Sequence, residues 1–202
     1  DAGRFILIKN KKHIPLSVFG KHNLYNIEAA RYICKEFGIS DNQFYLSIQD
    51  FSGASRRLTL IKEFTNSSIY YDFAHSPSKV SATIHAVREL HPNRYLIACL
   101  ELHTFSSLNS TFLKQYKGTM ENADKAFVYF NPETLKHKKL NEISSKDVLN
   151  AFDTQNVKVF TDSNLLVKEL SSLNWNNTNL LLMSSGNFDG IDFENLAQNL
   201  LG

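Results

Sequence analysis

Polar side chains follow three of the apolar segments of this chain, at the points where those segments end. Asp72 and His75 follow the first segment, Glu101 and His103 the second, and residues 184–190 the third. In open α/β sheets, ligands bind beyond the carboxyl ends of the strands. The three groups therefore predict a binding site at one edge of a sheet.

Each group alone also has an ordinary structural explanation. A carboxylate at a strand end, such as Asp72, caps a following helix more often than it binds a ligand. A histidine after a strand is more often a hydrogen-bonded structural group, and Gly186 and Gly190 suit a backbone with positive φ. A purely structural turn would need only one polar residue or glycine. The presence of several such residues after each of three strands therefore favours a binding site.

Another set of polar residues lies where a helix is expected to begin. In residues 20–37, His22 is followed by Asn23 and Asn26, whose spacing puts both amides on one helical face. Further along, Arg57 supplies a planar, always charged group that suits contact with a nucleotide. The structural alternatives are a helix cap for Asn23 and a surface ion pair for Arg57.

The apolar pattern predicts two parts, residues 1–53 and an open α/β domain at 54–202. The first part is expected to hold strands at 4–8 and 14–18, helices at 22–37 and 41–49, and a linker at 51–55. Continuous apolar strands in the second part are typical of a parallel sheet covered by helices on both faces. There we expect a hairpin at 58–64 and 68–73, strands at 95–102, 126–130, 157–160 and 180–183, and helices from 76 and at 109–122, 145–152, 163–171 and 193–200.

Composition excludes several other classes. Hydrophobic residues make up 43% of the 202 residues and the net charge is +2, which favours a packed core over disorder. The densest basic cluster, residues 136–139, is a small footprint for nucleic acid and is interpreted as a solvated loop. No apolar run reaches the ~20 residues of a membrane helix. Cys34 and Cys99 form no close pair, so we expect reduced thiols and a cytoplasmic protein.

Five segments resemble the motifs of one enzyme family in their order along the chain. Residues 20–26, 55–58 and 71–77 are together similar to the adenosine side of the ATP site in the Mur ligases of bacterial cell-wall synthesis. Residues 100–109 and 183–191 resemble the motifs that follow. Within that family the murein peptide ligase branch is most similar, because Tyr-Asp-Phe-Ala-His-Ser-Pro at 71–77 resembles its Asp-Asp-Phe-Ala-His-His-Pro.

The resemblance implies a fold, a reaction and residue roles. The fold is a Rossmann-like C-terminal domain at 54–202, preceded by a remnant of the central ATP-binding domain at 1–53. The reaction uses ATP and Mg²⁺ to join UDP-N-acetylmuramate to the tripeptide L-Ala-γ-D-Glu-meso-diaminopimelate through an acyl phosphate, in peptidoglycan recycling. The implied nucleotide contacts are His22, Asn23, Asn26, Arg57 and Asp72, and the implied contacts to the peptide substrate are His75, His103, Ser185, Gly186 and Asn187.

No segment of the chain reads Gly-x-x-x-x-Gly-Lys-Ser/Thr, the P-loop that activates ATP. We therefore expect the 202 residues alone to be inactive and to contain neither catalytic residues nor metal ligands. Two alternatives stay open. One is a UDP-N-acetylmuramate–L-alanine ligase, which would be favoured by Tyr-Gly-His-His-Pro instead of Phe-Ala-His-Ser-Pro at 73–77. The other is a non-catalytic nucleotide-binding α/β module.

Overall fold

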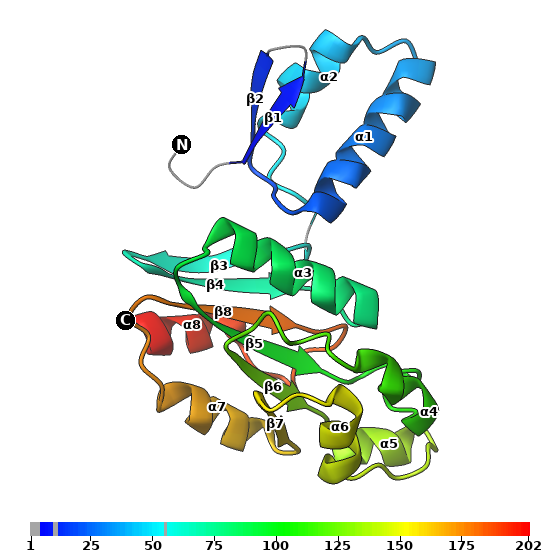
Figure 1. Cartoon of the computed structure of the whole chain (residues 1–202), viewed down its shortest axis with the longest axis vertical. Helices are drawn as coiled ribbons and strands as arrows, with labels where there is room; N and C mark the ends of the chain where they lie inside the picture. The colour runs from blue at the N-terminus through cyan, green and yellow to red at the C-terminus, as the bar shows by residue number, and fades with distance from the viewer. Residues whose placement is uncertain (1–4, 10–11, 55) are drawn as a thin grey trace.

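The computed structural model describes residues 5–9, 12–54 and 56–202, and its described strands form two separate sheets (Figure 1). The smaller sheet is an antiparallel pair of β1 (Phe5–Lys9) and β2 (Lys12–Leu16). Helices α1 (Lys21–Glu36) and α2 (Asp41–Ile48) complete this first part. Ile14, Leu16, Ile27 and Phe44 are buried in a small core of its own.

The larger sheet has six described strands in the order β3-β4-β8-β5-β6-β7. Its first strand is antiparallel to its neighbour and the other pairs are parallel, which confirms the expected open, mostly parallel α/β sheet. Because β8 lies between β4 and β5, the three strands that carry the polar groups end side by side. The strands are β3 (Thr59–Phe64), β4 (Ser67–Asp72), β5 (Tyr95–Glu101), β6 (Lys125–Tyr129), β7 (Val157–Phe160) and β8 (Thr178–Met183).

Helices cover both faces of this sheet. Strand β5 shows why: Leu96, Ala98 and Leu100 belong to one buried cluster, and Ile97 and Cys99 to the other, so alternate side chains enter opposite cores. The first cluster includes residues of α3 and α6, and the second includes residues of α7 and α8. The helices are α3 (Pro77–Leu90), α4 (Ser110–Leu113), η1 (Lys114–Tyr116), α5 (Pro132–His137), α6 (Ser145–Phe152), α7 (Ser163–Ser171) and α8 (Phe193–Leu201).

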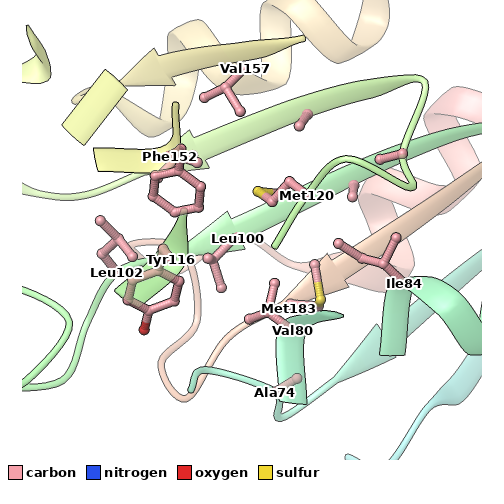
Figure 2. Packing of buried hydrophobic residues seen from close by; sticks show 14 of the residues in the cluster. Ala74, Val80, Ile84, Leu100, Leu102, Tyr116, Met120, Phe152, Val157 and Met183 are labelled. Atoms are coloured by element: carbon pink, nitrogen blue, oxygen red, sulfur yellow. The ribbon is translucent and has the colours of Figure 1, made fainter. Parts of the chain in front are cut away.

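Aromatic side chains fill one end of the first cluster (Figure 2). Tyr116 and Phe152 are fully buried and stack with ring centroids 5.2 Å apart. Leu100, near the end of β5, and Leu102, just after it, belong to the same cluster. The end of β5 therefore packs against this aromatic part of the core.

The structure differs from the expected helices in two places. The helix expected at 109–122 is confined to α4 and η1, and the chain then turns at Gly118, where φ is +71°. The short helix α5 was not anticipated. Ser76 precedes α3 as expected, but its side chain makes no capping hydrogen bond, and Pro77 occupies the first turn.

In the sequence, Leu24, Ile27, Ile33, Cys34 and Phe37 recur at helical spacing and predict an apolar stripe on α1. This prediction is partly wrong. Ile33 and Phe37 are 60% and 81% exposed, whereas Arg31 is buried. The guanidinium of Arg31 forms ion pairs with Glu28 at 2.7 Å and with Asp41 at 2.8 Å. A paired charge therefore takes the position between α1 and α2 that the pattern assigned to apolar residues.

The two parts meet where α1 begins. Gly20 has φ +88°, and a Cβ at this position would lie 2.7 Å from the Cβ of Ala86 on α3. Only glycine permits both this conformation and this close approach. The start of α1 is thereby held against α3. None of the helices in the described ranges is long and apolar enough to cross a membrane.

A pH effect on stability is expected from His91, just after α3. Burial, with a smaller effect of Arg94, lowers its pKa from 6.5 to about 4, and Nε2 lies 2.8 Å from the Tyr70 hydroxyl. As the pH is lowered, His91 is protonated in the unfolded chain at a higher pH than in the folded chain. The free energy of unfolding therefore decreases as the pH falls from 6.5 to about 4. Urea unfolding at several pH values should show a smaller fall in His91→Gln than in the unsubstituted chain. His85→Gln, at an exposed histidine, is the control, and an equal fall in all three would contradict the prediction.

Candidate functional site

A cleft of about 790 Å³ lies between the two parts. Its walls come from α1, from the linker before β3, and from α3. Val18, Ile27, Ile48 and Phe51 give it apolar sides. The cleft also contains all five residues that the sequence assigned to a nucleotide: His22, Asn23, Asn26, Arg57 and Asp72.

The two asparagines enter from the first turns of α1. Asn23 is fixed in place because its Nδ2 donates to the Phe19 carbonyl at 2.8 Å. Asn26, one turn later, is exposed to the cleft. The helical spacing therefore delivers both amides to one wall, as expected, and Asn23 also makes a local contact at the start of the helix.

His22 lies beside the charged residues of the cleft. Its burial lowers its pKa, the negative charge of Asp72 counteracts this, and the positive charge of Arg57 adds to it. A neutral imidazole is therefore favoured at neutral pH. Such a ring can donate one hydrogen bond and accept another.

Arg57 lies between the linker and β3, and Asp72 is the last residue of β4. Asp72 is 5% exposed, and its carboxylate accepts N–H groups of Leu58 and Ala74, each at 2.6 Å. Burial raises the pKa of Asp72, and these two hydrogen bonds oppose the rise. The Arg57 guanidinium carbon lies 5.7 Å from the centroid of the Phe73 ring. The cleft thus contains a buried carboxylate, and Arg57 gives it a cation that can reach an anionic ligand.

A second polar cluster lies at the ends of β5 and β8. Glu101 is 3% exposed, and its Oε2 accepts the Phe188 N–H at 2.9 Å and the Ser184 hydroxyl. The same hydroxyl accepts the Gly186 N–H at 2.6 Å. His103 Nδ1 lies 3.5 Å from Glu101 Oε1. Glu101 therefore connects both strand ends to the loop that follows β8.

Gly186 allows this loop to approach β5 closely. A Cβ on Gly186 would lie 2.7 Å from Glu101 Oε2 and 3.0 Å from His103 Cγ and Nδ1. The Tyr71 hydroxyl donates to the Ser184 carbonyl at 3.1 Å, which joins β4 to the same loop. The neighbouring strand ends are thus bonded into one surface.

The residues assigned to the peptide substrate are only partly brought together. His103, Ser185 and Gly186 lie at the β5–β8 ends, and the Ser185 hydroxyl is buried with no hydrogen-bond partner among the described residues. Asn187 is exposed in the loop, where its Oδ1 accepts the Gly190 N–H at 3.1 Å. His75 lies after β4, with Nδ1 2.8 Å from the Phe73 carbonyl oxygen. None of these residues lines the 790 Å³ cleft.

Sequence reasoning missed several residues that the structure places at these sites. The sequence places Glu101 at a strand end beside the predicted site, but it assigns Glu101 no contact, and nothing in the sequence shows that its side chain is buried. Lys79 and Thr83 line the cleft from α3 because they lie one helical turn apart. Within residues 5–9, 12–54 and 56–202, no group of three or more His, Cys, Asp or Glu side chains is placed to hold a metal ion.

Comparisons with known proteins identify the family of this chain. Residues 56–186 match the family model described as Mur ligase, glutamate ligase domain. A UDP-N-acetylmuramate–L-alanine ligase from Caldicellulosiruptor bescii is 34% identical over 116 residues, 57% of this chain and 25% of that protein.

Two solved structures extend the comparison. A domain from a putative UDP-N-acetylmuramate:L-alanyl-γ-D-glutamyl-diaminopimelate ligase of Haemophilus ducreyi is 26% identical with a TM-score of 0.50, and the alignment covers 72% of this chain and 97% of that domain. A MurF ligase from Thermotoga maritima in complex with ADP has a TM-score of 0.67 and 14% identity, and the alignment covers 99% of this chain and 44% of that one.

The family is therefore resolved more firmly than the branch within it. Named relatives include L-alanine ligases, and structural neighbours include a murein peptide ligase, so the expected branch stays a prediction. The chain spans between a quarter and two fifths of the length of the curated relatives that it matches. The match over residues 56–186 covers most of the chain, and the chain belongs to the Mur ligase family.

Proposed function

We propose that this chain supplies one wall of the nucleotide site and the amine-binding surface of an ATP-dependent ligase that acts on UDP-N-acetylmuramate. The observation that carries the proposal is the cleft between the two parts, where His22, Asn23, Asn26, Arg57 and Asp72 converge. Its volume of about 790 Å³ is within the usual range for small-molecule pockets, about 300–1,000 Å³.

The chemistry of the cleft suits an adenine nucleotide. A flat heterocycle can lie between apolar walls such as Ile27 and Phe51, while the amides of Asn23 and Asn26 offer hydrogen bonds to its edge. Arg57 provides the charge-assisted contact that an anionic ligand needs. A structural neighbour, the MurF ligase from Thermotoga maritima, was solved in complex with ADP.

The proposed reaction activates a carboxylate. The terminal phosphoryl group of ATP is transferred to the lactyl carboxylate oxygen, the acceptor amine attacks the resulting acyl phosphate, and phosphate leaves as the amide forms. Water would hydrolyse the acyl phosphate, so the two parts must close over it. Mg²⁺ would neutralise charge on the phosphates, but the described residues offer no ligand set for it, and we assign them no metal-dependent step.

The acceptor that we propose is the tripeptide L-Ala-γ-D-Glu-meso-diaminopimelate. Support comes from the murein peptide ligase motifs at 71–77 and from the Haemophilus ducreyi domain, which the alignment covers over 97% of its length. L-alanine is the second candidate, and the names of the sequence relatives, including the one that is 34% identical, favour it. UDP-N-acetylmuramate is named as a substrate in both groups.

Nucleotide binding is tested by calorimetry with ADP and the 202-residue chain. Asn26→Ala is expected to weaken binding by about tenfold, the effect of one lost hydrogen bond. Asn195→Ala, the same substitution in the first turn of α8, is the control and should change nothing. Without a P-loop, we expect the chain alone to release no phosphate from ATP. Equal binding by both variants would remove Asn26 from the site.

Acceptor choice is tested in a ligase that contains this chain. L-alanine and the tripeptide compete at equal concentration for UDP-N-acetylmuramate and ATP, and the two products are separated by mass. We expect mainly the tripeptide product, because polar groups left unpaired by a truncated acceptor reject it strongly. Equal or greater use of L-alanine would favour the second candidate.

A further inference from the structure

Asp72 connects two separate segments through the two oxygens of its carboxylate. Oδ1 accepts the N–H of Ala74, which follows the same strand. Oδ2 accepts the N–H of Leu58, the last of the residues 56–58 that continue the linker up to β3. Both donor–acceptor distances are 2.6 Å, and Asp72 is 5% exposed. The carboxylate therefore fixes the end of the linker to the end of β4.

The linker adopts a conformation that needs such support. Arg56 and Leu58 have φ values of +57° and +48°, which are strained for residues with a Cβ. The Arg56 carbonyl accepts the Phe73 N–H at 2.9 Å. Hydrogen bonds to β4 and the residues after it thus hold the residue on each side of Arg57.

Arg57 is the residue whose direction this arrangement determines. Its backbone lies between the two strained residues, and its side chain lines the cleft. Loss of either flanking hydrogen bond would allow the backbone at Arg57 to rotate. The guanidinium would then leave the cleft without any change in its own chemistry.

We propose that Asp72 is a positioning residue that holds the linker so that Arg57 points into the nucleotide cleft. The inference rests on the proposed function for the ligand, and it differs from the direct ribose contact that the family resemblance implies for Asp72. A ribose contact acts on the nucleotide hydroxyls, whereas positioning acts through Arg57. The two roles give different results with a nucleotide that lacks those hydroxyls.

The first experiment measures amide hydrogen exchange in the chain without ligand. Asp72→Asn keeps the size of the side chain but replaces one acceptor oxygen with an N–H₂ group, so Leu58 or Ala74 loses its partner. Exchange at one or both amides should rise by about tenfold. Unchanged exchange at both amides would overturn the proposal, whatever the ligand is.

The second experiment measures binding of ADP and of 2′,3′-dideoxy-ADP. Asp72→Asn should weaken both by the same factor, about tenfold. In an Arg57→Ala background the further loss should be less than about twofold, because residues that act as a unit are non-additive. Loss confined to ADP, or factors that multiply in the double variant, would overturn positioning in favour of a ribose contact.

Asp124→Asn is the matched control. The Asp124 carboxylate also accepts a backbone N–H, that of Leu96 at 2.7 Å, and pairs with Arg88 at 2.5 Å, but it does not line the cleft. It should lower stability without changing ADP affinity or exchange at Leu58. If the unsubstituted chain binds no ADP, the nucleotide proposal fails, while the exchange experiment still tests whether Asp72 holds the residues on either side of Arg57 in place.

Discussion

Replacing Phe152 with alanine is expected to lower the free energy of unfolding by about 3–5 kcal/mol, the range for aromatic residues in well-packed cores. The ring is fully buried at the end of α6 and stacks on Tyr116, which is equally buried (Figure 2). The Phe152 carbonyl accepts the Gly118 N–H, a backbone contact that the substitution leaves in place. The loss therefore reports packing and the cavity that remains.

Urea unfolding followed by circular dichroism measures this effect. Leu149→Ala on the same helix is the control, because Leu149 is 43% exposed and its removal should cost well under half as much. The loss of unfolding free energy in Phe152→Leu should lie between the losses in Phe152→Ala and Leu149→Ala. Similar losses for Phe152→Ala and Leu149→Ala would mean that α6 does not depend on this core for its position.

The sheet was predictable because its strands must be apolar on both faces. A continuous apolar run such as residues 96–100 fits a strand with a core on either side, and β5 has this arrangement. The same pattern predicted that polar residues after the strands would share an edge. Strand order could not be read from the sequence, and the position of β8 between β4 and β5 is what brings Asp72, Glu101 and Ser184 together.

Helix faces were less predictable where charged residues are buried. Arg31 is buried because Glu28 and Asp41 pair with it, and this pairing depends on how α2 packs on α1. A pattern of apolar residues contains no such information, so Ile33 and Phe37 were wrongly placed in the core. Pairing between helices is a tertiary effect that overrides the local signal.

Some residues of the candidate site could likewise be predicted from the sequence, and others could not. Asn23 and Asn26 were predictable as neighbours because helical spacing alone places them on one face. Glu101 was not predictable as the centre of the second cluster, because its partners Ser184 and Phe188 are far away in sequence. The family resemblance implied that residues of the loop after β8 contact the substrate. Only the structure shows that Gly186 in this loop lies so close to Glu101 that a side chain would not fit.

Replacing that glycine, Gly186, with alanine is expected to reduce kcat/KM for the acceptor by roughly 100-fold in a ligase that contains this chain, the scale of a 1 Å misplacement near reacting groups. Gly186 is not among the residues with positive φ, so the obstacle is steric. The new Cβ would lie 2.7 Å from Glu101 Oε2, and either the carboxylate or the loop must move. The overpacked chain should also lose about 1–3 kcal/mol of stability.

Gly190→Ala in the same loop separates this contact from backbone strain. Gly190 has φ +85°, but nothing lies within 4 Å of the Cβ that it would gain. It should cost about 1–2 kcal/mol for the left-handed conformation and leave Glu101 and His103 in place. Acceptor kinetics and urea unfolding, measured for both variants, distinguish the two causes. If Gly190→Ala lowers acceptor use as much as Gly186→Ala does, the conformation of the whole loop is decisive, and the close approach of Gly186 to Glu101 has no special role in binding the acceptor.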